Sequence, residues 1–217
     1  MFAIAQTFTT DINCHKLFVA YWKGDFISAE TCSRNADACF PTSKMPQLLL
    51  IYHTFYRGLV AFRLFRQIQA GATGIDDELL LAYKQEQCIN EGKESIVKMN
   101  RWAQNCTEVF ENKLLLLKAE FAAWVTFGDA EELYKASIKA ARKDNKHEMA
   151  LAHELLGDYY ASCGRADDAR SSFNHACVYY TQWGADAIAK RLSAKHGLNS
   201  TPNNDDTNDK AACKRQR

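Results

Sequence analysis

Cysteine and histidine are the residue types in this sequence best suited to bind a metal. The chain of 217 residues holds eight cysteines and six histidines. A structural zinc site needs closely paired ligands such as Cys-x2-Cys, with a second pair nearby. Cys32 and Cys39 are too far apart for such a pair, and Cys14-His15 has no obvious partner pair. We therefore expect no metal and no other cofactor.

Nucleophilic catalysis would use a cysteine or serine beside a base and an orienting acid, which can be remote in sequence. No local signature accompanies any cysteine or serine here. The phosphate-binding loop GxxxxGK[ST] and the kinase motifs HRD and DFG do not occur in the sequence either. We expect buried thiols and capping hydroxyls in a protein that is not an enzyme. A helical enzyme whose site these motifs do not capture stays open as an alternative.

The composition is that of an ordinary globular protein, with 47% hydrophobic and 24% charged residues. Its 27 Lys and Arg nearly balance 26 Asp and Glu, whereas nucleic acid or an anionic membrane surface requires a basic excess. No uncharged apolar run reaches the about 18 residues that would span a bilayer. The scattered cysteines favour reduced thiols. We therefore expect a cytoplasmic protein with neither nucleic-acid nor membrane partners.

The elements that would position any site are helices, because prolines are few and no segment alternates for long with the period of a strand. The first helix should stop at Gly24-Asp25, where the aspartate caps a second helix over residues 26–38. Residues 48–70 are apolar on nearly all sides, so this helix belongs in the middle of the assembly or against a partner. A further helix is expected over residues 78–106, with an interruption near 90–92 as the alternative.

Residues 151–183 form the clearest unit, two antiparallel helices joined by a glycine turn. Apolar residues recur at three- and four-residue steps on both sides of Gly164. This glycine should take the left-handed backbone of a helix end. The small residues Ala169 and Ala176 would let the two helices approach closely, while Phe173 fills the space between them.

This unit resembles a tetratricopeptide (TPR) repeat. The motif positions are held by Leu156-Gly157, Tyr160, Gly164, Ala169, Phe173 and Ala176. His153 replaces the tryptophan of the motif, and Thr181 replaces its closing proline. A degenerate second copy lies upstream, with its turn at Gly128 and with Asp129 as the N-cap of a capping box that Glu132 completes.

The resemblance implies an all-α fold, a TPR-like α-solenoid of about four antiparallel helix pairs over residues 1–198. The clearest repeats are residues 112–146 and 147–183. A helix over residues 185–196 would cap the open end of the array, which terminal repeats require. Residues 199–217 carry almost no apolar side chains, and we expect this tail to be disordered.

A more particular likeness covers most of the chain. It is carried by RWAQNC (101–106), KAE (118–120), LYKASI (133–138), HEMALAHELLGDYY (147–160) and VYYTQWGADAIAKRL (178–192), with LFVAYWKGDF (17–26) and HTFYRGL (53–59) before them. These segments resemble the helical-repeat region of very large signalling ATPases. In that family a P-loop domain precedes the repeats, often with a protein-kinase domain before it. The resemblance implies that this chain corresponds to the helical-repeat arm of such a protein and does not contain the ATPase domain.

TPR arrays bind partners in a concave groove lined by the first helix of each pair. The motif places Leu115, Lys118, Ala122 and Thr126 of one pair and Leu151, Glu154, Asp158 and Ser162 of the next in this groove. These residues include no pair of basic side chains suited to hold a peptide carboxylate, which disfavours capture of an acidic C-terminal tail. A solvated face without a ligand is the alternative.

We therefore expect a non-enzymatic scaffold or regulatory arm that binds a protein or peptide, within a signalling-ATPase system. An ATPase or kinase domain is among the candidate partners. A free-standing TPR adapter is the second interpretation.

Overall fold

The computed structural model describes residues 2–40, 46–72, 78–141 and 144–198, and these residues fold into nine helices with no strand among them. The helices are α1 (Phe2–Lys23), α2 (Phe26–Cys39), α3 (Gln47–Gln69), α4 (Glu78–Asn105), α5 (Thr107–Trp124), α6 (Glu131–Ala140), α7 (Lys146–Ser162), α8 (Ala166–Gln182) and α9 (Asp186–His196). The predicted all-α class is confirmed. The tail over residues 199–217 lies outside the described residues.

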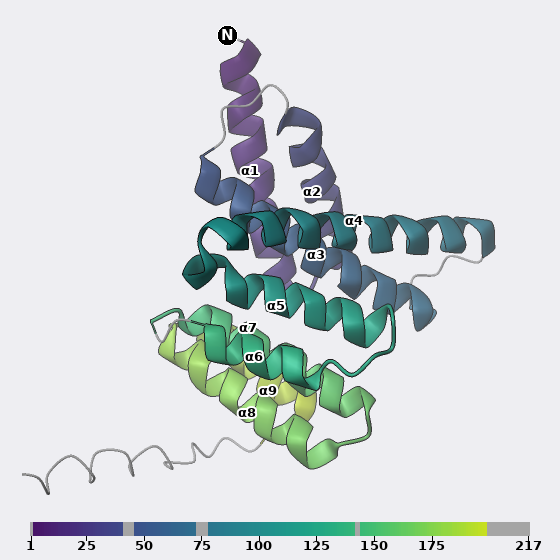
Figure 1. The fold of residues 1–217 in the computed structure, drawn as a ribbon, viewed down its shortest axis with the longest axis vertical. Helices are drawn as coiled ribbons and strands as arrows, with labels where there is room; N and C mark the ends of the chain where they lie inside the picture. The colour runs from purple at the N-terminus through teal and green to yellow at the C-terminus, as the bar shows by residue number, and fades with distance from the viewer. Residues whose placement is uncertain (1, 41–45, 73–77, 142–143, 199–217) are drawn as a thin grey trace, which may run out of the picture.

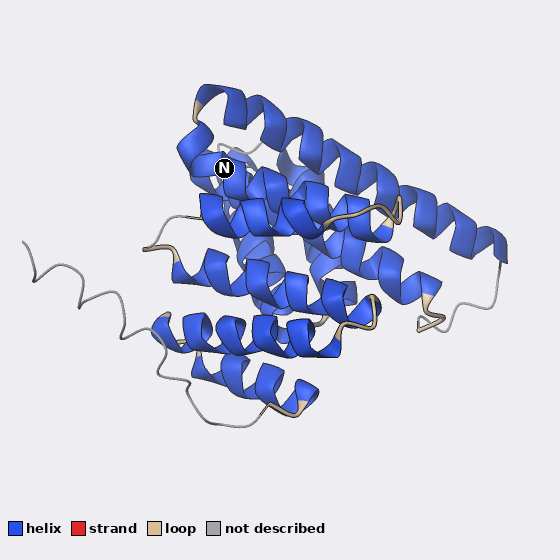
Figure 2. Cartoon of the chain, turned by 60° about the horizontal axis from the view of Figure 1, so that its bottom comes forward, coloured by secondary structure: helices blue, strands red, loops and turns tan. Residues whose placement is uncertain are grey.

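Consecutive helices pack side by side as α1 with α2, α3 with α4, α5 with α6 and α7 with α8, and α9 packs on α8. Helices α1 and α2 run across the direction of α4 and α5, and α6 to α9 lie beyond α5 (Figure 1). The second view shows the helices from α4 onward as successive rows (Figure 2). Helix α3 contacts α1, α2, α4 and α5, so it occupies the centre of the fold.

The central helix α3 is apolar because it is buried. Phe55, Leu59 and Phe62 are each at most 3% exposed. This helix is long and apolar enough to cross a membrane, but 67% of the qualifying window is buried inside the fold, which accounts for its composition. A Cβ atom at Gly92 of α4 would lie 2.3 Å from the Phe62 ring. Gly92 therefore lets α4 approach α3, and α4 runs through residues 90–92 without the interruption considered from the sequence.

The α7/α8 pair has the predicted geometry. Gly164 has a φ of +73°, and the Arg165 N–H donates to the Tyr160 carbonyl at 2.9 Å, which closes the end of α7. A Cβ atom at Gly157 would lie 2.6 Å from the Phe173 ring. Phe173 is 2% exposed, so its ring fills the space that the missing side chain leaves, as the sequence predicted.

The turn between α5 and α6 differs from the prediction. The left-handed residue is Phe127, with a φ of 51°, and Gly128 has no positive φ. The Gly128 N–H donates to the Ala122 carbonyl at 2.8 Å, so the residue before the glycine makes the turn. Asp129 accepts from the Glu131 N–H at 3.0 Å, and Glu132 is an exposed partner of Lys135. The predicted capping box of Asp129 and Glu132 is therefore wrong.

The C-terminal end of α1 reaches α8 and α9. The ring of Trp22 lies 5.8 Å from that of Tyr180 and 5.6 Å from that of Trp183, measured between centroids. An Arg191 Nη atom of α9 donates to the Trp22 carbonyl at 2.6 Å. The first helix pair and the last helices of the described chain thus touch directly.

Candidate functional site

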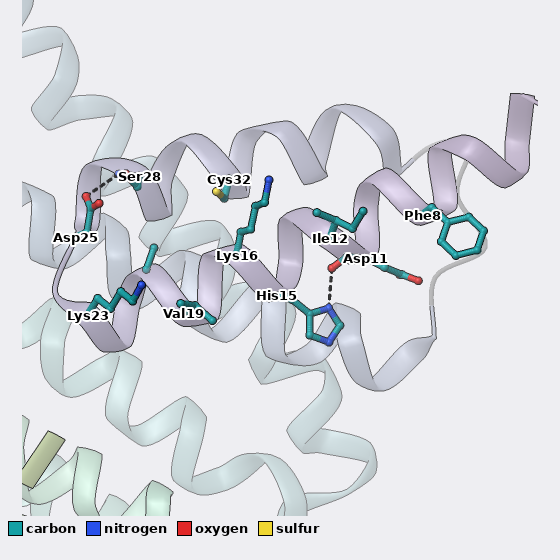
Figure 3. A pocket seen from close by; sticks show the side chains of 11 residues that line it. Phe8, Asp11, Ile12, His15, Lys16, Val19, Lys23, Asp25, Ser28 and Cys32 are labelled. Carbon is teal, nitrogen blue, oxygen red and sulfur yellow. Dashed lines mark hydrogen bonds between the residues drawn. The ribbon is translucent and has the colours of Figure 1, made fainter. Parts of the chain in front are cut away.

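A groove of about 550 Å³ runs between α1 and α2. Helix α1 contributes Phe8, Ile12 and Val19, and α2 contributes Ser28 and Cys32 (Figure 3). Gly24, with a φ of +80°, ends α1, and Asp25 caps α2 by accepting from the Ser28 N–H at 3.1 Å. This predicted turn is confirmed, and it sets the two helices antiparallel so that a groove runs between them.

The apolar side chains of the groove are exposed. Phe8 is 64% exposed, Ile12 51% and Val19 54%. Their spacing of four and seven residues places them on one face of α1. The opposite face carries Leu17 and Tyr21, which are buried in the core. Helix α1 thus has two apolar faces, and only one of them is covered by the described chain.

Charged groups flank the apolar floor of the groove. Lys16 and Lys23 line it, and neither has a described carboxylate within 4.0 Å. Asp11 has a buried Oδ1 atom without a hydrogen-bond partner among the described residues. Hydrogen bonds from Ser28 lower the pKa of Asp25, which keeps this carboxylate ionised in its capping role. The groove therefore offers two ammonium groups beside an apolar strip.

The structure places two of the predicted groove residues in the interior instead. Leu151 is 2% exposed and Asp158 8%. Arg63 of α3 donates to an Asp158 oxygen at 2.5 Å, and an Arg66 nitrogen lies 3.5 Å from the same oxygen. Burial alone would raise the pKa of Asp158, but the two guanidinium groups hold it at about 2. These two side chains therefore do not line an open surface: Arg63 and Arg66 of α3 engage Asp158, and Leu151 belongs to the hydrophobic core.

The other predicted groove residues remain at least partly exposed. Thr126 and Ser162 are exposed, and Leu115, Lys118, Ala122 and Glu154 are half-buried. Glu154 accepts from the Tyr180 hydroxyl at 2.6 Å, so the fold itself engages that carboxylate. The prediction that these residues bind a partner stays a prediction.

The buried titratable groups serve structure. Lys113 of α5 and Glu148 of α7 form an ion pair in the interior, and Asn112 donates to the same carboxylate at 2.6 Å. Burial raises the pKa of the Cys14 and Cys88 thiols to about 12, so both stay protonated near neutral pH. No group of three or more acidic, histidine or cysteine side chains is placed to hold a metal ion within the part of the chain that the structure describes.

Reasoning from the sequence missed the groove. The sequence predicted where α1 ends, at Gly24-Asp25, but assigned no role to its exposed apolar stripe. Phe8, Ile12 and Val19 carry a helical spacing that a search for a second apolar face would have found.

Comparison with known protein families, with characterised proteins and with solved structures finds no match to this chain, so no family assignment follows.

Proposed function

We propose that this chain is a non-enzymatic helical-repeat scaffold that binds an amphipathic helix of a partner protein in the α1/α2 groove. One observation carries the proposal: the exposed stripe of Phe8, Ile12 and Val19 beside an open apolar groove. Contiguous apolar surface on a helix face is costly to leave in water, and such patches mark interaction sites. The sequence resemblance favours a regulatory arm of a signalling-ATPase system, built as a TPR-like solenoid.

A helix is the occupant that suits the shape of the groove. The stripe from Phe8 to Lys23 extends about 22 Å along α1, which corresponds to about four helical turns. Two antiparallel helices already present such a groove to α3 on their other side, since α3 packs against both α1 and α2. A partner helix would repeat this packing on the free side, with apolar anchors three and four residues apart.

The charges of the groove specify the partner further. Lys16 and Lys23 favour acidic residues along one edge of the partner helix. The expected partner is therefore an amphipathic helix with an acidic edge, rather than a basic or uniformly apolar one.

Peptide selection tests the proposal. A library of 18-residue peptides is selected against the wild-type chain and counter-selected against the Ile12→Glu/Val19→Glu variant. We expect enriched sequences with helical apolar spacing and an excess of Asp and Glu, and at least tenfold weaker binding to the variant in titration calorimetry. Val97→Glu serves as the matched control, because Val97 of α4 is 62% exposed and lies outside the groove.

Three outcomes would overturn the proposal. The first is enrichment of peptides without helical spacing, and the second is equal binding to the groove variant and to the wild type. The third is a wild-type dimer in light scattering that the groove variant converts to a monomer, because a second copy of the chain would then be the occupant. Circular dichroism melting of both variants confirms that each is folded.

A further inference from the structure

A second recess lies where the end of α1 meets α3, α7 and α9. It has a volume of about 240 Å³ and is lined by the last turn of α1 together with residues of α2, α3, α7 and α9. The apolar walls are Tyr21, Trp22, Phe26 and Leu192. The recess suits a ligand smaller than a typical drug-sized molecule.

The recess gathers positive charge in a chain that is almost neutral overall. Four basic side chains line it: Lys23, Arg63, Arg191 and Lys195. Glu154 is the one carboxylate in the lining, and Asp158 lies behind the recess, bound to Arg63 and 4.0 Å from Lys195. Lys23 and Arg191 have no described carboxylate within 4.0 Å. Four cations therefore face two carboxylates, of which Glu154 already accepts from Tyr180.

We propose that this recess binds a small molecule carrying carboxylate or phosphate groups. Lys23 and Arg191, which have no described carboxylate within 4.0 Å, add to the other cations of the recess a local potential that attracts anions. One Arg191 nitrogen is used on the Trp22 carbonyl. The guanidinium of Arg191 has further N–H groups for an oxyanion, and the two lysines add mobile point charges.

The recess connects both ends of the described chain. Trp22 and Lys23 belong to α1, whereas Arg191 and Lys195 belong to α9. An anion held between them would bridge the first and the last helix and offset the repulsion between their cations. Lys23 also lines the α1/α2 groove. An anion bound to Lys23 in the recess would neutralise one of the two ammonium groups of that groove.

Nuclear magnetic resonance titration of the full chain tests this site. The probes are inorganic phosphate, citrate and adenosine monophosphate, each at constant ionic strength set with sodium chloride. We expect saturable shifts of the backbone amides of residues 23–24 and 191–195 with at least one probe. Citrate alone would identify the carboxylate class, and phosphate or the nucleotide would identify the phosphate class. Absence of saturable shifts at these amides with all three probes would overturn the proposal.

Two variants separate a built site from general charge effects. Lys23→Gln/Lys195→Gln should weaken binding of the effective probe at least tenfold. Lys190→Gln is the matched control, because this exposed lysine lies on α9 outside the recess, and it should change the affinity less than twofold. Equal losses in the double variant and the control would show unspecific attraction and refute the site. Denaturation curves confirm that both variants fold.

Discussion

Arg63 of α3 and Asp158 of α7 form a hydrogen-bonded ion pair inside the fold, with side chains 12% and 8% exposed. The pair joins two helices that are distant in sequence, and Arg66 lies beside it. A buried carboxylate of this kind is stable only with its cations, because each charge has lost its hydration. The pair therefore fixes how α3 sits across α7 and explains why the predicted groove is closed there.

Asp158→Asn should destabilise the protein by about 3–5 kcal/mol, since it leaves Arg63 and Arg66 buried without their carboxylate. Urea unfolding at neutral pH measures the loss. The matched control is Asp168→Asn, which breaks an exposed pair with Arg165. That change should cost less than about 1 kcal/mol. Similar losses of unfolding free energy in both variants would show that the buried pair contributes no more to stability than the exposed one.

Phe173→Ala should lower the free energy of unfolding by about 3–5 kcal/mol, because the ring is buried and fills the space beside Gly157. Gly157→Ala should cost about 1–3 kcal/mol, since its Cβ atom would meet that ring. In the double variant the clash is absent, so the combined loss should be smaller than the sum. Strict additivity in urea unfolding would contradict the contact.

Gly164→Val should destabilise the α7/α8 pair by about 1 kcal/mol or more, because a β-branched residue resists a φ of +73°. No atom lies within 4 Å of the added Cβ, so the cost is conformational. Gly128→Ala is the control: its φ is not positive, and the nearest atom to the added Cβ lies at 3.5 Å. Thermal melting should show a decrease for the first variant and almost none for the second.

Phe127→Gly should stabilise the protein by up to about 1 kcal/mol. The left-handed backbone costs a non-glycine residue about 1–2 kcal/mol, and the entropy of glycine in the unfolded chain offsets part of this gain. Phe127 is 71% exposed, so little packing is lost. Phe127→Ala keeps the unfavourable φ and should give no such gain. A rise in melting temperature with alanine alone would contradict the explanation.

Acidification from pH 7 to pH 5 should destabilise the protein through His53. Burial lowers the pKa of His53 from 6.5 to about 4 in the folded state. The unfolded state then binds more protons between pH 6.5 and pH 4, so stability falls as the pH is lowered through this window, by about 2 kcal/mol at pH 5.

Urea unfolding at both pH values checks this window. His53→Gln should reduce the pH dependence, although burial also lowers the pKa of His153 to about 4 and leaves part of it. An unchanged slope in His53→Gln would refute the assignment.

The sequence predicted the parts of the fold that local spacing encodes. Gly164 and Phe173 mark a helix turn and a close packing site within one pair, and both expectations are confirmed. The turn at Phe127 could not be predicted, since a glycine stands next to it and offers the more favourable left-handed residue. The interruption of α4 near Gly92 failed for a related reason: the glycine serves packing against Phe62, which lies in another helix.

The candidate site could not be predicted from local residue spacing, for a different reason. Both faces of α1 are apolar, and the sequence does not state which face α3 covers. The burial of Asp158 likewise depends on Arg63, which comes from a helix pair far upstream. Only the tertiary arrangement decides which apolar stripe is free and which charged residue lies inside.

The contact of Trp22 with Trp183 and Arg191 also bears on how the protein unfolds. In an open repeat array each unit touches only its neighbours, and such arrays lose structure progressively from their ends. Here the end of α1 contacts the end of α8 and α9 through Trp22, so fraying of α9 would also release the end of α1. Melting of the nine described helices should therefore be one cooperative transition, and formation of this non-local contact should slow folding relative to an open array of equal length.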